Sequence, residues 1–415
     1  MKAINSAFCL SMLAPVPYAW HLHSRTRALA DQFARRGLRV RYVAPPTPRA
    51  MLRHWIAPWR ERRAGEVELV WPLPAPPLHW QQRLRLVDAI AARQARRITP
   101  DSNGTPHVIV AATPLWTPVV AHAPCDLLIY DCLDDPLVHA RASSNDIYRR
   151  WHEELCRRAD VIVAVSAALA ERLREMCERR VVVCGNGVDA DAFGALSNRE
   201  SPGPSAQLYE TCDPALREWF AWRRAHANHP VAGFVGSIDR WVDVELLAAT
   251  ARALPHVQFA VAGPERYRGL AAPLAGIQNV HRIGLVSYKA VPALIATFDV
   301  GLIPFRVGPI AAAADPLKVY EYAAAGKAVV CSVPLRLDDP DAPLVIAEAP
   351  AAFASAVAAA AAAAAAQSPN DSAAREQRIA FASRHTWAAR AEQFLDLIAN
   401  TLRNGGVPPR NAAKP

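Results

Sequence analysis

Short apolar runs recur along the chain, and each is followed by a segment with helical spacing of its apolar side chains. Residues 7–13 form one such run, and residues 25–36 after it carry a helical pattern that stops at Gly37. Residues 38–43 are predicted to form the next strand. Strands that are apolar on both faces are typical of parallel sheets covered by helices. The pattern therefore predicts an α/β chain built from β–α–β units.

The same rhythm restarts in the second half, after a polar segment rich in Ser, Pro and Gly at residues 194–213. A chain of 415 residues is too long for one compact core. Asn186-Gly187 closes the first half as a turn that is expected to need positive φ. The prediction is a first domain at 1–193, a linker and bridging helix at 194–228, a second domain at 229–385, a helix at 386–404 packing back toward the first domain, and a disordered tail at 405–415.

Composition restricts the location and the partners. The net charge of +9 favours anionic partners, although a coding bias toward arginine explains it equally well. The arginines do not gather with stacking aromatic residues in one segment, which argues against nucleic acid. The eight cysteines form no Cys-x-x-Cys pair, which indicates a reducing compartment. The apolar start at 3–14 has no convincing cleavage site, so we expect a first strand and a cytoplasmic protein.

One stretch near the end of the second half has the features of an anion site. Asp315 is predicted to be an N-cap, Pro316 to occupy the first helical position, and Gly326 to supply the left-handed C-cap. The free N–H groups of such a helix start attract anions, and Lys318 adds a full charge. Glu321 stands one turn further on and can accept hydrogen bonds from two neighbouring hydroxyls. A nucleotide diphosphate sugar offers both groups; the alternative is a helix that only caps itself.

Polar residues in the first half also follow predicted strands. The loop at 15–24 follows the first strand and carries His21 and His23, and a later strand ends at Asp131 and Asp134. Ligands bind at the carboxyl ends of strands in open parallel sheets, so the loop is a candidate cleft wall. No second set of metal ligands accompanies the carboxylates, so we expect them to bind acceptor hydroxyls or to act as a base.

The order of these segments resembles that of GT-B glycosyltransferases, in which two Rossmann-like domains with parallel sheets face a cleft. It is most similar to bacterial transferases of the group 1 or family 4 kind used in surface polysaccharide assembly, including the teichuronic acid type. The resemblance covers nearly the whole chain. It rests on residues 16–21 and 130–135 in the first half and on residues 186–189, 234–237, 263–264, 283–286, 299–305 and 315–330 after them.

This resemblance implies a binding site for the nucleotide-sugar donor. Glu321 matches the carboxylate that binds the ribose, residues 316–318 fall where the backbone meets the diphosphate, and Gly236 matches a glycine turn that faces the same phosphates. Residues 282–284 match the loop that binds the base. The donor-binding residues predicted in this way are Gly236, Arg240, Arg282, Gly284, Asp315, Pro316, Leu317, Lys318 and Glu321.

Two residues depart from the family pattern. Ala313 stands where the first glutamate of the Glu-x7-Glu motif would touch the donor sugar, and Ser237 stands where an arginine usually follows the glycine turn. Arg240, Arg306 or Lys318 can replace the missing charge. The same losses also fit a subgroup with a different phosphate clamp, or a protein without activity.

The expected activity is transfer of a sugar from a nucleotide diphosphate to an acceptor hydroxyl, without metal or cofactor and with retention of configuration. The expected partners are the donor, a saccharide or lipid-linked acceptor and the inner face of the membrane. The alternatives are a sugar-nucleotide epimerase or phosphorylase of the same fold, and a binding protein without catalysis. We predict His21, His23 and Asp134 as catalytic residues and Trp20, Arg25 and Asp131 as acceptor-binding residues.

Overall fold

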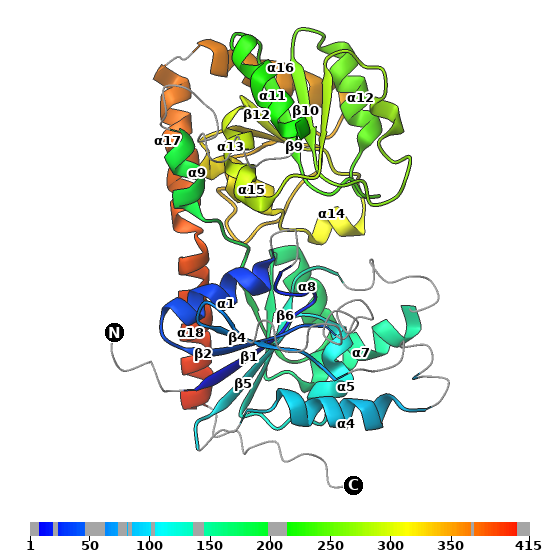
Figure 1. Ribbon diagram of the computed structural model, residues 1–415, viewed down its shortest axis with the longest axis vertical. Coiled ribbons are helices and arrows are strands. Elements are labelled where there is room, and N and C mark those ends of the chain that lie inside the picture. Colours follow the sequence, from blue (N-terminus) through cyan, green and yellow to red (C-terminus); the bar gives the residue numbers. More distant parts are fainter. Residues whose placement is uncertain are drawn as a thin grey trace. The chain divides into compact units, whose positions relative to one another are not determined.

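The protein consists of two compact units, which we describe separately (Figure 1). The computed structural model describes residues 8–19, 24–45, 63–73, 81, 85–100, 104–135, 145–197, 214–366 and 369–404. The first unit comprises Met1–Gly185 and Trp387–Pro415, and the second comprises Asn186–Thr386. The chain therefore passes from one unit to the other twice, at Gly185–Asn186 and at Thr386–Trp387.

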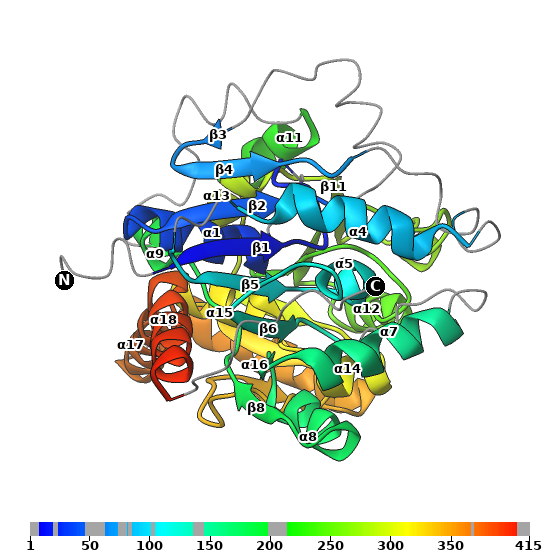
Figure 2. The same cartoon turned by 90° about the horizontal axis from the view of Figure 1, so that it is seen from below.

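The first unit is built on an eight-stranded sheet in the order β3-β4-β2-β1-β5-β6-β7-β8, which Figure 2 shows from below. The central strand β1 (Cys9–Leu13) is buried and pairs in parallel with β2 (Arg39–Val43) and β5 (His107–Ala111). Within the described residues, the pairing of β3 with β4 is the antiparallel exception. The other strands are β3 (Arg63–Ala64), β4 (Val67–Val70), β6 (Leu127–Cys132), β7 (Val161–Ala164) and β8 (Arg180–Val183).

Helices cover both faces of this sheet (Figures 1 and 2). One face carries α1 (Arg25–Arg35) and α18 (Trp387–Asn404), whose Phe33 and Phe394 rings lie 6.3 Å apart edge to face. The last helix of the chain thus belongs to the first unit. The opposite face and the sheet edge carry α4 (Val87–Ile98), η1 (Pro114–Trp116), α5 (Thr117–Val120), α7 (Asn145–Arg158) and α8 (Ala167–Met176).

The second unit is built on a six-stranded sheet in the order β11-β10-β9-β12-β13-β14, and every described pairing in it is parallel. Two apolar cores lie against it, one under α12 and α16 and the other under α11, α13, α15 and α17. The strands are β9 (Val231–Val235), β10 (Gln258–Ala262), β11 (Val280–Gly284), β12 (Val300–Ile303), β13 (Ala328–Cys331) and β14 (Val345–Ile346). The helices are α9 (Ala190–Ser197), α11 (Pro214–Ala225), α12 (Val244–Ala253), η3 (Ala272–Leu274), η4 (Tyr288–Ala290), α13 (Val291–Ala296), α14 (Pro309–Ala313), α15 (Leu317–Ala324), α16 (Pro350–Ala366) and α17 (Pro369–Arg384).

The predicted α/β class with two parallel-sheet domains is confirmed, but the boundary between the halves differs from the predicted one. The predicted first domain includes residues 186–193, whereas these residues belong to the second unit. Val188 donates its N–H to the carbonyl of His385 at 3.0 Å, and Phe193 is buried in the core of the second unit. These contacts are with residues far away in the sequence, so no local sequence pattern predicts them.

The predicted Asn186-Gly187 turn is wrong in its conformation. Neither residue has positive φ. Asn186 is held instead by two hydrogen bonds to Asp315, one from its backbone N–H to the carboxylate and one from its side-chain amide to the carbonyl at 2.6 Å. A tertiary contact has replaced the local turn that the dipeptide favours.

Across the described parts of the chain, we find no helix that is both long and apolar enough to cross a membrane. The alanine-rich helix α16 instead buries Phe353 and Val357 against the second sheet.

Close packing on β12 gives a test of the second core. A methyl group at Gly301 would lie 2.4 Å from the Tyr322 ring of α15. We expect Gly301→Ala to lower the free energy of unfolding of the second unit by about 1–3 kcal/mol, because overpacking displaces a buried ring. Urea unfolding followed by tryptophan fluorescence measures the change.

Gly194→Ala is the matched control, because no heavy atom lies within 4 Å of a methyl group there. Gly194 lies in α9, so the same substitution should leave stability unchanged or raise it by about 0.5–1 kcal/mol. Equal losses in both variants would contradict the packing described for Gly301.

Candidate functional site

The start of α15 differs from the predicted cap. The helix begins at Leu317 with Pro316 in the N-cap position, and no side chain caps it among the described residues. Asp315 is not the N-cap, because its carboxylate is used elsewhere: one oxygen accepts from the Tyr320 hydroxyl at 2.8 Å and the other accepts from the N–H of Asn186. The positive end of the helix dipole therefore carries no carboxylate of its own.

The end of α15 matches the prediction. Gly326 has φ of +70° and donates its N–H to Ala323 at 2.8 Å, while Lys327 donates to Tyr322 at 2.9 Å. These two bonds form a Schellman motif, which satisfies the last carbonyls of the helix. The glycine thus ends the helix and lets β13 begin at Ala328.

Lys318 and Glu321 contact each other along α15. The ammonium group of Lys318 donates to one carboxylate oxygen of Glu321, whose side chain is only 1% exposed. The other oxygen, Oε1, is buried and makes no hydrogen bond of ordinary geometry among the described residues, although the hydroxyl of Tyr288 lies near the Glu321 carboxylate. Buried polar atoms without a partner are rare and costly, so this oxygen is a candidate acceptor for a hydrogen-bond donor of a ligand.

Tyr288 is a neighbour of Glu321 that the sequence did not single out. Burial first, and then the negative charges of Glu321 and Asp189, raise the pKa of its hydroxyl above the ordinary value. Tyr288 follows β11 in the short helix η4, and its ring lies 6.5 Å from that of Phe193. No spacing in the sequence pairs residues 288 and 321, because only the packing of η4 near α15 brings them together.

Backbone groups meet closely at the carboxyl ends of β9, β10 and β11. Gly236 donates its N–H to Ala262 at 2.9 Å, and Gly263 donates to Gly284 at 2.6 Å. A methyl group at Gly263, where φ is +137°, would lie 1.8 Å from the carbonyl oxygen of Gly236. Only glycine fits there. The three predicted turns therefore lie at one edge of the second sheet.

A pocket of about 430 Å³ opens beside these turns. Two of the predicted donor-binding residues, Arg282 and Gly284, line it, and Arg282 lies 3.7 Å from the carboxylate of Glu265. Arg240 is exposed and lies over the Tyr267 ring at 4.7 Å, outside the set of residues that line the pocket. The whole lining comprises Ile238, Val261, Gly263, Pro264, Glu265, Arg282, Ile283, Gly284 and Leu285.

The residues proposed to replace the missing family charge differ in their surroundings. Arg306 pairs with Asp243 at 3.7 Å, so its charge is partly balanced. Ala313 is buried at the end of α14, with 1% of its surface exposed. Lys318 differs from Arg240 and Arg306 because it lies in the first turn of α15 itself.

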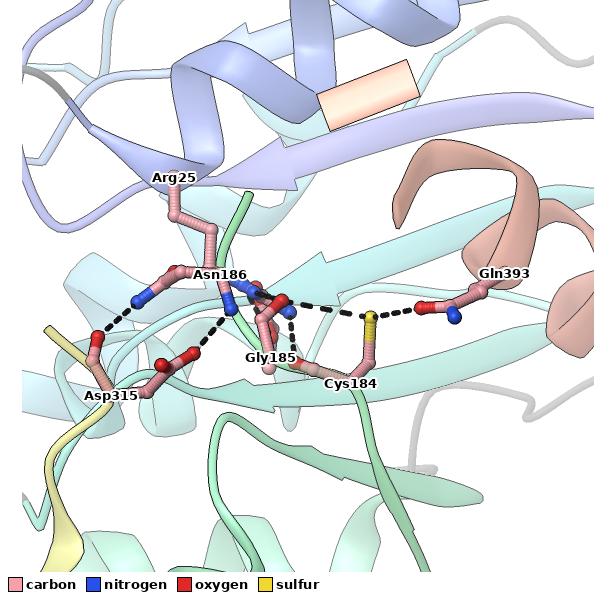
Figure 3. Close-up of polar contacts among 7 residues, drawn as sticks. Arg25, Cys184, Gly185, Asn186, Asp315 and Gln393 are labelled. Carbon is pink, nitrogen blue, oxygen red and sulfur yellow. Dashed lines mark hydrogen bonds and ion pairs between the residues drawn. The ribbon is translucent and has the colours of Figure 1, made fainter. Parts of the chain in front are cut away.

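In the first unit, Arg25 and Asp131 form a buried ion pair at 3.1 Å. Arg25 also donates to the carbonyl oxygens of Gly185 at 2.6 Å and Cys184 at 2.9 Å. Burial disfavours the charged form of Arg25 and lowers its pKa. The charges of Asp131 and Cys184 and the hydrogen bonds to them outweigh this effect, so the pKa of Arg25 lies above its ordinary value. Figure 3 shows Arg25 next to Gly185 and Cys184. The thiol of Cys184 in turn donates to Gln393 at 3.2 Å. The pair therefore fixes the chain where it leaves the first unit, and its predicted acceptor contact stays a prediction.

The other predicted residues of the first unit are spread more widely. Asp134 is exposed just after β6, next to Asp135, which pairs with Arg172 at 3.1 Å. Trp20, His21 and His23 lie outside the described residues. In the portion of the chain that is described, no three His, Cys, Asp or Glu side chains are grouped to hold a metal ion.

Residues 22–192 match the family described as Glycosyltransferase Family 4, and residues 240–396 match a family described as Glycosyl transferase-like. The two matches together span most of both units. Each half of the chain is therefore similar to a glycosyltransferase family, and the two parallel-sheet units have the GT-B fold.

Solved structures share the fold of this GT-B protein. A sucrose-phosphate synthase from Thermosynechococcus elongatus has a TM-score of 0.67 at 16% identity, covering 96% of this chain and 100% of its own. HepE from Anabaena in complex with UDP and glucose has a TM-score of 0.60 at 17% identity, covering 94% and 99%. An E. coli trehalose-6-phosphate protein bound with UDP-2-fluoro glucose has a TM-score of 0.65 at 13% identity, covering 97% and 100%. At these identities the likeness concerns the fold.

A curated relative shares more of its sequence over a shorter stretch. TuaH of Bacillus subtilis (strain 168), named as a teichuronic acid biosynthesis glycosyltransferase, is 27% identical over 217 residues. The match covers 49% of this chain and 50% of that protein, so it spans about half the length of the curated relative.

The buried pair of the first unit can be tested by its stability. We expect Arg25→Met to lower the free energy of unfolding by about 3–5 kcal/mol, because it leaves the Asp131 carboxylate buried without its partner. Arg25→Met combined with Asp131→Leu should recover much of the loss. Urea unfolding followed by circular dichroism measures both.

Arg157→Met serves as the control, because Arg157 is 65% exposed and pairs with Glu154 on the helix surface. Its change should stay within about 1 kcal/mol. A double variant as unstable as Arg25→Met alone would contradict the pairing of Arg25 with Asp131.

Proposed function

We propose that the protein transfers a sugar from a nucleotide diphosphate donor to an acceptor hydroxyl. The observation that carries this proposal is the buried, unpartnered Oε1 of Glu321, one turn after the uncapped start of α15. A ribose hydroxyl supplies the donor that Glu321 lacks, and a diphosphate supplies the negative charge that the helix start favours. Two of the similar structures are complexes with UDP or with a UDP-sugar derivative.

Charge at the start of α15 would assist the reaction. The diphosphate gains negative charge as the bond to the sugar breaks, and preorganised N–H groups together with Lys318 would stabilise that charge. Lys318 donates to Glu321 in the free protein. Donor binding would therefore break this internal pair and replace it with two contacts to the ligand. Lys318 would bind the diphosphate, and Glu321 would bind the ribose.

The donor contacts in this proposal extend to other residues of the second unit. Gly236 and the backbone of residues 316–318 would face the phosphates, and Arg240 would add charge. The pocket beside Arg282 and Gly284 would hold the base. Tyr288 joins the set as a neighbour of Glu321.

The acceptor side of the proposal belongs to the first unit. His21, His23 and Asp134 would bind or activate the acceptor hydroxyl, with Trp20, Arg25 and Asp131 around it. The acceptor would be a saccharide or a lipid-linked saccharide, in keeping with the teichuronic acid pathway named for TuaH. We place the reaction in the cytoplasm, at the inner face of the membrane, where the net charge of +9 would favour anionic lipid head groups.

Donor binding is tested by isothermal titration calorimetry with UDP, GDP, dTDP and their sugars. We expect Glu321→Ala and Lys318→Ala each to weaken binding more than tenfold, about 1.4 kcal/mol or more, because each removes one of the two proposed contacts. Glu245→Ala, an exposed carboxylate at the start of α12, should bind as the wild type does.

Unchanged affinity in both site variants would contradict the assignment of the site. A wild type that binds no nucleotide would favour the alternative of a protein without catalysis. That alternative rests on Ala313, which is buried where the family has the first glutamate of its motif.

The chemistry of transfer has its own test. We expect turnover to persist in EDTA, because Lys318 and the helix start would carry the charge of the leaving diphosphate. Proton NMR of the product should show the anomeric configuration of the donor sugar, as the family 4 resemblance implies. Loss of turnover in EDTA that added Mg²⁺ restores, or an inverted product, would refute the corresponding part of the proposal.

A further inference from the structure

Asp315 connects the start of α15 to the first residue of the second unit. Its carboxylate accepts the N–H of Asn186, and its carbonyl accepts from the Asn186 side chain at 2.6 Å, as Figure 3 shows. Asp315 and Asn186 are 6% and 9% exposed, so water does not compete freely for these bonds. The residue next to the proposed diphosphate contact thus holds the chain immediately after Gly185, where the first unit ends.

Tyr320 extends the same network to the second connection between the units. Its hydroxyl donates to Asp315 at 2.8 Å, and its ring lies 5.7 Å from that of His385. The carbonyl of His385 accepts the N–H of Val188 at 3.0 Å, and Val188 forms a parallel bridge with Thr386. Both segments at which the chain enters or leaves the second unit therefore contact residues 315–320.

We infer that Asp315 is a positioning residue that couples donor binding at the start of α15 to the order of the connecting segment 186–188. The inference rests on the proposed function, because it requires a nucleotide diphosphate at the helix start. Asp315 itself has no place in that diphosphate contact, since its oxygens already accept from Asn186 and Tyr320.

The coupling follows from shared hydrogen bonds. A ligand that binds the N–H groups after Pro316 restricts the backbone on one side of Asp315, and the Asp315 carboxylate then holds Asn186 with less freedom. Ordering at one end lowers the entropic cost of ordering the other. Amide exchange measures this order directly, because an amide exchanges only when its hydrogen bond opens.

The test is hydrogen–deuterium exchange of the full chain with and without saturating UDP, read in peptides that cover 185–189 and 316–324. In the wild type we expect UDP to slow exchange in both peptides about tenfold, equivalent to about 1.4 kcal/mol. In Asp315→Asn, whose single carbonyl oxygen cannot serve both donors, UDP should still protect 316–324 but should protect 185–189 less than about twofold.

Two further variants keep the test sharp. Tyr320→Phe retains the ring packing and removes only the hydroxyl that donates to Asp315. UDP should therefore slow amide exchange of 185–189 less in this variant than in the wild type, and this readout remains usable if Asp315→Asn folds poorly. Asp341→Asn removes an exposed carboxylate of the same unit and should behave as the wild type.

The outcomes separate the two ideas. Protection of 316–324 without protection of 185–189 in the wild type overturns the coupling and leaves the donor site intact. Equal protection of both peptides in all variants also overturns it. No protection anywhere in the wild type overturns the nucleotide site and the coupling with it.

Discussion

All strands of the second sheet run in one direction, and the candidate site depends on this constraint. In a parallel sheet the carboxyl ends of the strands meet at one edge, so the turns after β9, β10 and β11 and the helix after β12 come together there. Because Gly263 has no side chain, the turn after β10 can lie directly against the backbone of Gly236 in the turn after β9. The edge then presents backbone groups and a helix start, which are the groups that bind phosphate.

Burial decides how the charged residues near this edge are used. Asp315 has its carboxylate turned to Asn186 and Tyr320, whereas Glu321 keeps one buried oxygen without a partner. Two carboxylates six residues apart in the sequence thus have different tasks. One holds the polypeptide in place, and we propose that the other accepts from a ligand hydroxyl.

The sequence predicted the elements well because their signals are local. The apolar runs gave β1, β9 and β12, and Gly326 ended α15 where its left-handed backbone requires it. The contacts that the sequence misjudged are all long-range. Asn186-Gly187 has the composition of a turn, yet the bonds from Asp315 hold it in another conformation, and Tyr288 becomes a neighbour of Glu321 only through packing.

The sequence by itself determined the two parallel-sheet units, the glycine turns and the helix that carries Lys318 and Glu321. Periodicity and the C-cap glycine of α15 act over a few neighbours, so they can be recognised without coordinates, whereas the N-cap predicted at Asp315 could not. Only the tertiary structure decided that Asp315 binds Asn186, that Arg25 and Asp131 form an internal pair, and that Oε1 of Glu321 is left without a partner. Each of these depends on which polar groups are buried together, and burial is a property of the packed chain and not of any local stretch of sequence.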